Sequence, residues 1–135
     1  METIKSKIVV RKQDLIYPEL SYEIVGAAYE VANQLGGGHL EKFYQKAMAI
    51  ELEKRKINFT EQVYYSLKYK DEVIGKHFFD FLAEEKIVVE LKKNNHFSKA
   101  HIEQVLQYLK TSKLKLALLI NFSGETVIHK RIVNE

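Results

Sequence analysis

The sequence predicts an α/β protein with a mixed central sheet flanked by helices, and three patterns lead to that prediction. Apolar residues recur at helical spacing before residue 56 and again after residue 97. Residues 62–92 have the alternation and the short turns of three antiparallel strands. Residues 114–122 are apolar almost throughout, as in a strand covered on both faces. Together they predict an antiparallel three-strand meander, a crossover helix, a buried parallel strand and an edge strand.

The first two helices are predicted on either side of a run of three glycines. The helix at residues 18–35 has an apolar face made of Ile24, Ala28, Val31 and Leu35. Gly36-Gly37-Gly38 ends this helix, since each glycine costs about 1 kcal/mol in a helix interior. The second helix is expected from His39 or Leu40 to about Arg55. Its inward face is expected to comprise Leu40, Phe43, Ala47 and Ile50.

The remaining elements are strands and one further helix. Strands are expected at about residues 63–69, 73–83 and 87–92, and the short turns between them favour antiparallel neighbours. Ser98 is expected to cap a helix that ends near Thr111 or Ser112. The apolar run of residues 114–122 follows that helical crossover and is therefore expected to lie parallel to the third strand. A last strand is expected from Thr126 to Val133, where the mixed alternation suits a sheet edge.

Three charged residues, Asp80, Glu90 and Lys92, interrupt an otherwise apolar strand hairpin. Burying an unpaired charge costs several kcal/mol or more, so these groups either lie at exposed strand ends or have a ligand. Glu90 and Lys92 share a face because side chains alternate along a strand. A three-residue loop, Glu84 to Lys86, would place Asp80 across from Glu90. A two-residue loop would instead place Asp80 opposite Val89.

The three-residue loop would bring two carboxylates together, which is the sequence's main indication of a divalent metal. Such a pair is destabilising by up to about 1 kcal/mol unless a cation or a proton lies between the two groups. The chain has no cysteine, so oxygen ligands and Mg²⁺ or Mn²⁺ are favoured over a structural zinc. Lys92 would lie beside the metal, placed to orient or deprotonate a water or to stabilise charge on phosphorus. The implied reaction is metal-assisted hydrolysis of a phosphodiester.

Several motifs, in chain order, carry a resemblance to a known family. Residues 38–44, Gly-His-Leu-Glu-Lys-Phe-Tyr, have the GxxExxY pattern, and Asp80 followed by Glu90-Leu91-Lys92 has the pattern of a nuclease core. Residues 24–28 in the first helix and residues 118–122 in the buried strand add support. Over nearly its whole length the chain resembles the GxxExxY protein family, a branch of the PD-(D/E)XK nuclease-like superfamily.

This resemblance implies a restriction-endonuclease-like fold and a set of catalytic residues. It implies that Asp80 and Glu90 are metal ligands and that Lys92 is the catalytic lysine. It also implies that Glu41, from the second helix, is an additional catalytic carboxylate at the metal. From the residues alone, Glu41 is equally well explained as a carboxylate favoured by the dipole at a helix start.

Five further residues are expected to bind nucleic acid or to support the site. Gln104 and Tyr108 resemble the Gln-x-x-x-Tyr pattern of RecB-like nucleases, and their spacing puts them on one helix stripe, where they could contact a phosphate backbone. Tyr44, the last residue of the GxxExxY motif, is given a role at the site. Lys93 and Lys99 could form a basic rim, which a phosphate backbone favours through counterion release, and they are equally well explained as a solvated face.

Other residues are given structural interpretations or mark departures from the family. Ala32 stands where the family often has a histidine, and the three glycines replace its usual Gly-Pro-Gly. His101 shares a helix side with Gln104 but is expected to be a solvated or core-edge residue. A site role is expected even less for His77 and His129.

The sequence therefore predicts a metal-dependent nuclease that hydrolyses phosphodiester bonds of nucleic acid, DNA more than RNA. The alternative is a non-catalytic module that keeps the fold to bind nucleic acid or protein. The net charge of +3 is compatible with an anionic partner. The chain lacks a G-x-S-x-G context and a phosphate-binding loop, which disfavours serine hydrolases and nucleotide triphosphatases.

The length of the chain and its lack of targeting signals lead to expectations about domain number and location. The 135 residues are expected to form one domain, with residues 1–14 as an N-terminal extension. No signal peptide or membrane segment is found in the sequence, so a cytoplasmic protein without a membrane partner is expected. A homodimer would suit an enzyme that cuts both strands, although no stretch identifies a dimer surface.

Overall fold

The computed structural model describes residues 16–93, 97–124 and 126–135, and the expected N-terminal extension lies outside them. The elements, in chain order, are α2 (Pro18–Leu35), α3 (Glu41–Lys54), β1 (Phe59–Tyr69), β2 (Glu72–Ala83), β3 (Ile87–Lys92), α4 (Lys99–Ser112), β4 (Leu116–Ser123) and β5 (Thr126–Val133). The predicted sequence of helices and strands is confirmed. None of the described helices is long and apolar enough to span a membrane.

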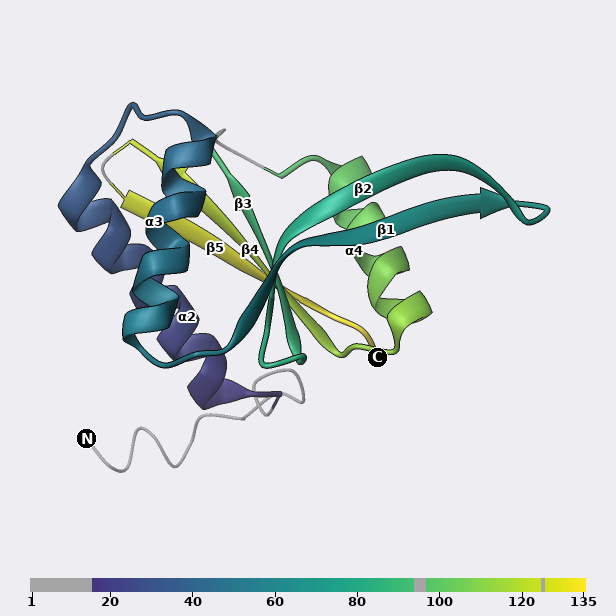
Figure 1. Cartoon of the computed structure of the whole chain (residues 1–135), viewed down its shortest axis with the longest axis horizontal. Helices are drawn as coiled ribbons and strands as arrows, with labels where there is room; N and C mark the ends of the chain where they lie inside the picture. The colour runs from purple at the N-terminus through teal and green to yellow at the C-terminus, as the bar shows by residue number, and fades with distance from the viewer. Residues whose placement is uncertain (1–15, 94–96, 125) are drawn as a thin grey trace, which may run out of the picture.

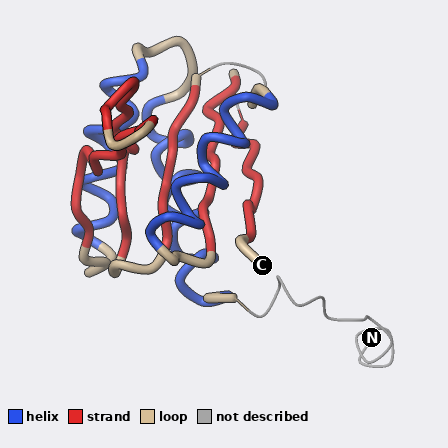
Figure 2. The backbone as a smooth tube through the Cα atoms, turned by 90° about the vertical axis from the view of Figure 1, so that its right-hand side faces the viewer, coloured by secondary structure: helices blue, strands red, loops and turns tan. Residues whose placement is uncertain are grey.

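The five strands form one mixed sheet in the order β1-β2-β3-β4-β5. Strands β3 and β4 are parallel and the other neighbouring pairs are antiparallel, as the sequence predicted. Helix α4 is the crossover between the parallel strands. It covers one face of the sheet, and α2 and α3 cover the other (Figure 1). The same three layers are seen from a second direction in Figure 2, where α4 lies in front of the sheet.

Two apolar cores lie on the two faces of the sheet. The core under α2 and α3 includes Ile24, Ala28, Val31, Met48, Phe81, Val89 and Leu91. The core under α4 includes Tyr65, Phe79, Val88, Val105, Tyr108, Leu109 and Leu119. Strand β4 contributes to both, and its residues from Leu116 to Phe122 are all buried, which confirms the prediction of a strand covered on both faces.

The prediction for the inward face of α3 is wrong. Leu40 and Ile50 are both 56% exposed and Phe43 is 43% exposed, whereas Tyr44, Met48 and Leu52 are buried. Tyr44 stacks on Phe122 of β4, with ring centroids 4.5 Å apart, and its hydroxyl donates to the Gly36 carbonyl at 2.7 Å. The side of α3 that faces the sheet is therefore the stripe of Tyr44, Met48 and Leu52, which are spaced by four residues. Ala47 lies beside this stripe and is only half-buried.

The loop between β2 and β3 has three residues, as predicted. Ala83 pairs with Ile87 and Leu82 with Val88, so Glu84 to Lys86 form the connection. Glu84 and Glu85 take left-handed conformations with φ of 51° and 55°, and the Lys86 N–H donates to the Ala83 carbonyl at 2.8 Å. This register, rather than the two-residue alternative, puts Asp80 at the level of Glu90.

The β1–β2 hairpin twists strongly at Asp80. Phe81 belongs to the core under α2 and α3, whereas Phe79 belongs to the core under α4. On β1 the ladder is interrupted at Gln62, whose φ is 54°. Beyond this point the hairpin leaves the sheet and extends over α4 (Figure 1). The twist turns the side of β2 that carries His77 and Phe79 toward α4.

Candidate active site

The carboxylates of Asp80 and Glu90 lie where β2 separates from β3. The ladder ends at Phe81 and Val89. Beyond it each carboxylate accepts a bond from the opposite strand's backbone: the Asp80 N–H donates to Glu90 Oε1 at 3.1 Å, and the Leu91 N–H donates to Asp80 Oδ2 at 2.7 Å. The two side chains therefore replace the interstrand backbone bonds at this level, which fixes both carboxylates at one point of the sheet.

The pKa of the Asp80 carboxyl group is raised by its surroundings. Burial raises its pKa to about 7, and the negative charge of Glu90 contributes to the rise. The Leu91 N–H partly offsets this by stabilising the anion, and the charge of Glu41 raises the pKa slightly. A cation at this position would remove the repulsion, so the cost inferred from the sequence is present in the folded protein.

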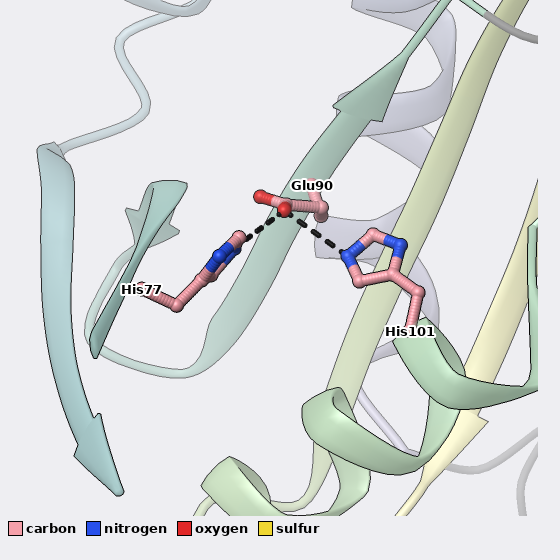
Figure 3. Close-up of side chains that lie close together, drawn as sticks. All are labelled: His77, Glu90 and His101. Atoms are coloured by element: carbon pink, nitrogen blue, oxygen red, sulfur yellow. Dashed lines mark hydrogen bonds and ion pairs between the residues drawn. The ribbon is translucent and has the colours of Figure 1, made fainter. Parts of the chain in front are cut away.

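Glu90 is 3% exposed and bonds to two histidines for which the sequence predicted no site role. His77 Nε2 lies 2.9 Å and His101 Nε2 lies 3.2 Å from Glu90 Oε2 (Figure 3). Burial by itself would raise the pKa of Glu90, but the bonds from His101, His77 and the Asp80 N–H together lower it below its ordinary value. Glu90 is therefore held as the anion while Asp80 is held toward the neutral acid.

Lys92 is half-buried and follows Glu90 on the same face of β3. It makes no ion pair with any other residue in the described part of the chain. Its side chain lines a cavity of about 610 Å³ between the β1–β2 hairpin and α4, together with His77, His101 and Gln104. The ammonium group is thus available to a ligand that enters this cavity.

Glu41 is the first residue of α3 and approaches the site from the opposite face of the sheet. Its Oε2 accepts a hydrogen bond from the Lys93 N–H at 3.0 Å, which ties the start of α3 to the end of β3. Glu41 itself is exposed, and its charge reaches Asp80. The structure therefore brings the predicted carboxylates Asp80, Glu90 and Glu41 to the same end of β3.

The five supporting residues have different environments. Gln104 lines the cavity beside Lys92. Tyr108 is 8% exposed and packs against Tyr65 and Phe79. Tyr44 is 1% exposed, so its geometry allows support of the glycine loop and no direct contact with a nucleic acid.

Lys93 and Lys99 are both exposed, and they lie at the end of β3 and at the first turn of α4. An exposed lysine at either position can reach an anion outside the protein without losing a partner in the fold. Because the first turn of α4 contacts β3 through His101 and Glu90, the basic rim formed by these lysines stays a prediction that fits their positions.

Asn121 is a buried polar residue next to Lys92. It is fully buried, it pairs with Lys92 in the parallel ladder, and neither polar atom of its carboxamide has a hydrogen-bond partner among the described residues. Partners in a ladder point to the same side of a sheet, so the carboxamide lies on the face that carries Lys92. An unpaired buried polar group costs about 1–3 kcal/mol.

We expect Asn121→Leu to raise the free energy of unfolding by about 1 kcal/mol, because it replaces an unpaired amide with an apolar group of the same branched shape. Urea unfolding measures the change. Asn134→Leu is the matched control, since the Asn134 amide donates to the carbonyls of Leu109 and Leu114 and its loss should destabilise the protein. A loss of stability in Asn121→Leu would mean that the carboxamide has a partner in solution.

The architecture and the placement of the site define the class of protein. A mixed five-stranded sheet with one parallel pair, covered by helices on both faces, has the restriction-endonuclease-like fold. An acidic pair and a lysine lie where β2 and β3 separate.

The chain belongs to the PD-(D/E)XK nuclease superfamily, whose family model matches residues 18–132. The crystal structure of SSO0001 is similar in fold, with a TM-score of 0.56 and 16% sequence identity over 87% of this chain. The chain spans 60% of the length of that protein. Comparison with curated proteins gives no match. The narrower resemblance to the GxxExxY family stays a prediction.

The residues present fit the divalent ion that nucleases of this superfamily generally use. Asp80, Glu90 and Glu41 offer carboxylate oxygens, which are the ligands that Mg²⁺ and Mn²⁺ prefer. His77, Glu90 and His101 form a second group in which one ligand atom from each residue lies within 4.8 Å of the others. Glu90 belongs to both groups.

Proposed function

We propose that the protein is a divalent-metal-dependent nuclease that hydrolyses phosphodiester bonds, with DNA preferred over RNA. The observation that carries this proposal is the buried Asp80–Glu90 pair, which holds Asp80 at a pKa of about 7 beside a lysine available to a ligand. A protein without a cation ligand gains nothing from keeping two carboxylates together in this way. Membership of a nuclease superfamily supports the same conclusion.

In this proposal Asp80, Glu90 and Glu41 hold Mg²⁺ or Mn²⁺. When bound, such an ion would neutralise negative charge on the scissile phosphate. Asp80 and Glu90 are positioned by backbone bonds across β2 and β3, so neither side chain needs to reorganise before an ion binds. Glu41 is fixed by the Lys93 N–H and completes the set from the α3 side.

Lys92 acts on the reacting groups. From the cavity wall its ammonium group can orient the attacking water and stabilise the negative charge that develops on phosphorus. In its neutral form, the same amine can instead accept the proton of the water as a general base.

The remaining predicted residues guide the nucleic acid. Gln104 lines the cavity with Lys92, and the exposed Lys93 and Lys99 each adjoin, in the chain, a residue that lines it, Lys92 and Ala100. Phosphate contacts of this kind position a nucleic acid without reading its sequence. Tyr108 and Tyr44 support the site by packing: Tyr108 packs from α4 against Phe79, and Tyr44 bonds to the Gly36 carbonyl of the glycine loop.

Calorimetric titration of Mg²⁺ and of Mn²⁺ into the wild type and into Asp80→Asn tests the proposal. We expect the wild type to bind the ion and the variant to bind at least about tenfold more weakly, because the variant loses a charged ligand. The carboxamide oxygen of the introduced asparagine can still accept the Leu91 N–H, so the fold should be retained. A wild type that binds neither ion would remove the nuclease proposal.

Cleavage assays on single-stranded DNA, double-stranded DNA and RNA then decide the substrate. Faster cleavage of RNA than of both DNA substrates would overturn the preference for DNA. If the wild type binds the ion but cleaves none of the three, the protein is instead the non-catalytic module that keeps the fold.

A further inference from the structure

The two histidines of the site come from elements outside the carboxylate pair and meet at one oxygen. His77 is on β2, Glu90 on β3 and His101 in the first turn of α4 (Figure 3). Both imidazole Nε2 atoms point at Glu90 Oε2, at 2.9 Å and 3.2 Å, and the three ligand atoms all lie within 4.8 Å of one another. The three residues are far apart in the sequence, and only the tertiary structure brings them together.

The spacing of these atoms is close to that of metal ligands. Zinc bonds of about 2.0–2.1 Å to nitrogen and oxygen put neighbouring ligands of a tetrahedral ion about 3.4 Å apart. The observed nitrogen–oxygen distances of 2.9 Å and 3.2 Å would need to lengthen by only a few tenths of an ångström. Two histidines and one glutamate form a ligand set that binds zinc with a further position open.

The three side chains are held before any ion binds. Glu90 is buried, and the side chains of His101 and His77 are only 11% and 26% exposed. The His77 ring packs edge-on against Phe79, with centroids 4.5 Å apart, and the His101 N–H is held by the Ser98 cap at 3.0 Å. Ligands fixed by packing lose little freedom on binding, so an ion here would meet a preformed site.

The open side of the group faces the cavity lined by Lys92 and Gln104. An ion can therefore enter from solvent, and a water or an anionic ligand can take the remaining position. The carboxylate uses its other oxygen, Oε1, to accept the Asp80 N–H, so the histidines and Asp80 lie at different ends of the same Glu90 carboxylate.

We propose that His77, Glu90 and His101 form a transition-metal site that takes Zn²⁺ or Co²⁺, distinct in its ligands from the oxygen-only group of Asp80, Glu90 and Glu41. Imidazole nitrogen suits zinc and similar ions, whereas Mg²⁺ takes oxygen ligands. This site does not depend on nuclease activity, because its ligands hold an ion whether or not a phosphodiester is cleaved. The alternative is that the histidines only neutralise Glu90 through hydrogen bonds.

Titration of Co²⁺ into the chelator-treated full chain separates these two possibilities, because the visible absorption of Co²⁺ reports its coordination geometry. We expect the wild type to bind about one equivalent of Co²⁺ with a spectrum typical of low coordination number, and Zn²⁺ to displace it. His77→Gln and His101→Gln should each weaken binding at least about 100-fold, more than the loss of an outer-shell partner usually does. His129→Gln on β5, an exposed histidine, is the matched control and should bind as the wild type does.

Asp80→Asn separates this proposal from the proposed nuclease function. It should bind Mg²⁺ at least about tenfold more weakly and Co²⁺ as the wild type does, whereas His101→Gln should bind Co²⁺ at least about 100-fold more weakly and Mg²⁺ as the wild type does. Circular dichroism checks that every variant is folded. If one of the two histidine variants does not fold, the other is sufficient for the test. A folded wild type that binds neither Co²⁺ nor Zn²⁺, or histidine variants that bind them unchanged, would overturn the transition-metal site and leave the Mg²⁺ titration unaffected.

Discussion

Lys92→Met should lower kcat for phosphodiester cleavage by at least about 100-fold and leave KM nearly unchanged. The methionine keeps the apolar stem of the lysine in the wall of the cavity and removes only the ammonium group. A group that stabilises charge or transfers a proton in the transition state typically contributes about 10²–10⁴-fold. Because the role proposed for the ammonium is to act on the reacting atoms, its loss should appear in kcat. Steady-state cleavage of a labelled DNA, with Mg²⁺ in excess, measures the effect.

Lys46→Met is the matched control, since Lys46 is exposed on α3 and its variant should cleave as the wild type does. Lys92→Arg divides the two roles of the lysine. Arginine stays protonated, so partial activity in this variant would indicate charge stabilisation, and loss of activity equal to that of Lys92→Met would indicate proton transfer. If Lys92→Met cleaves at the wild-type rate while folded, Lys92 has no catalytic role.

Asp80→Asn should make the metal-free protein more stable than the wild type by about 1–3 kcal/mol at pH 8, and the difference should shrink toward zero near pH 4. The pKa of Asp80 is raised to about 7 in the folded protein, chiefly by burial, from an ordinary value of 3.8. The folded state therefore binds the proton more tightly than the unfolded state does. Unfolding free energy consequently falls as the pH rises through this interval, and asparagine removes the effect.

Urea unfolding in the presence of a chelator, at pH 4, 6 and 8, measures the difference between the two proteins. The charged groups that act on Asp80, namely Glu90 and Glu41, are present in both proteins, as are the two histidines that bond to Glu90, so most of their own pH dependence cancels. Asp71→Asn in the exposed turn of the hairpin is the control and should show no such trend. Mg²⁺ at pH 8 should stabilise the wild type more than Asp80→Asn. A stability difference that is constant from pH 4 to pH 8 would show that Asp80 is ionised normally in the fold.

Local patterns were sufficient for most of the architecture. Strand β3 was predicted with its observed limits, the Ser98 cap was predicted and is present, and β4 was recognised from an apolar run that only a strand buried on both faces tolerates. The three-residue loop followed from the spacing of the hairpin, and it correctly placed Asp80 level with Glu90. Each of these depends on residues close together in the sequence, where spacing and side-chain alternation are enough.

The inward face of α3 needed more than spacing. Leu40, Phe43 and Ile50 formed as regular an apolar stripe as Tyr44, Met48 and Leu52. The contacts of Tyr44 fix which stripe faces the sheet, because its ring stacks on Phe122 of a distant strand and its hydroxyl donates to the Gly36 carbonyl. A helix that is apolar over more than one stripe can be oriented only by the surface on which it packs.

By itself, the sequence determined the acidic pair, the lysine beside it and the sheet that carries them. Only the tertiary structure decided that two histidines join Glu90. The sequence predicts no site role for His77 and a solvated or core-edge position for His101. The twist of the hairpin at Asp80 turns His77 toward α4, and the packing of α4 against β3 brings in His101. The twist depends on which core Phe79 and Phe81 each enter, and that is settled by contacts between residues far apart in the chain.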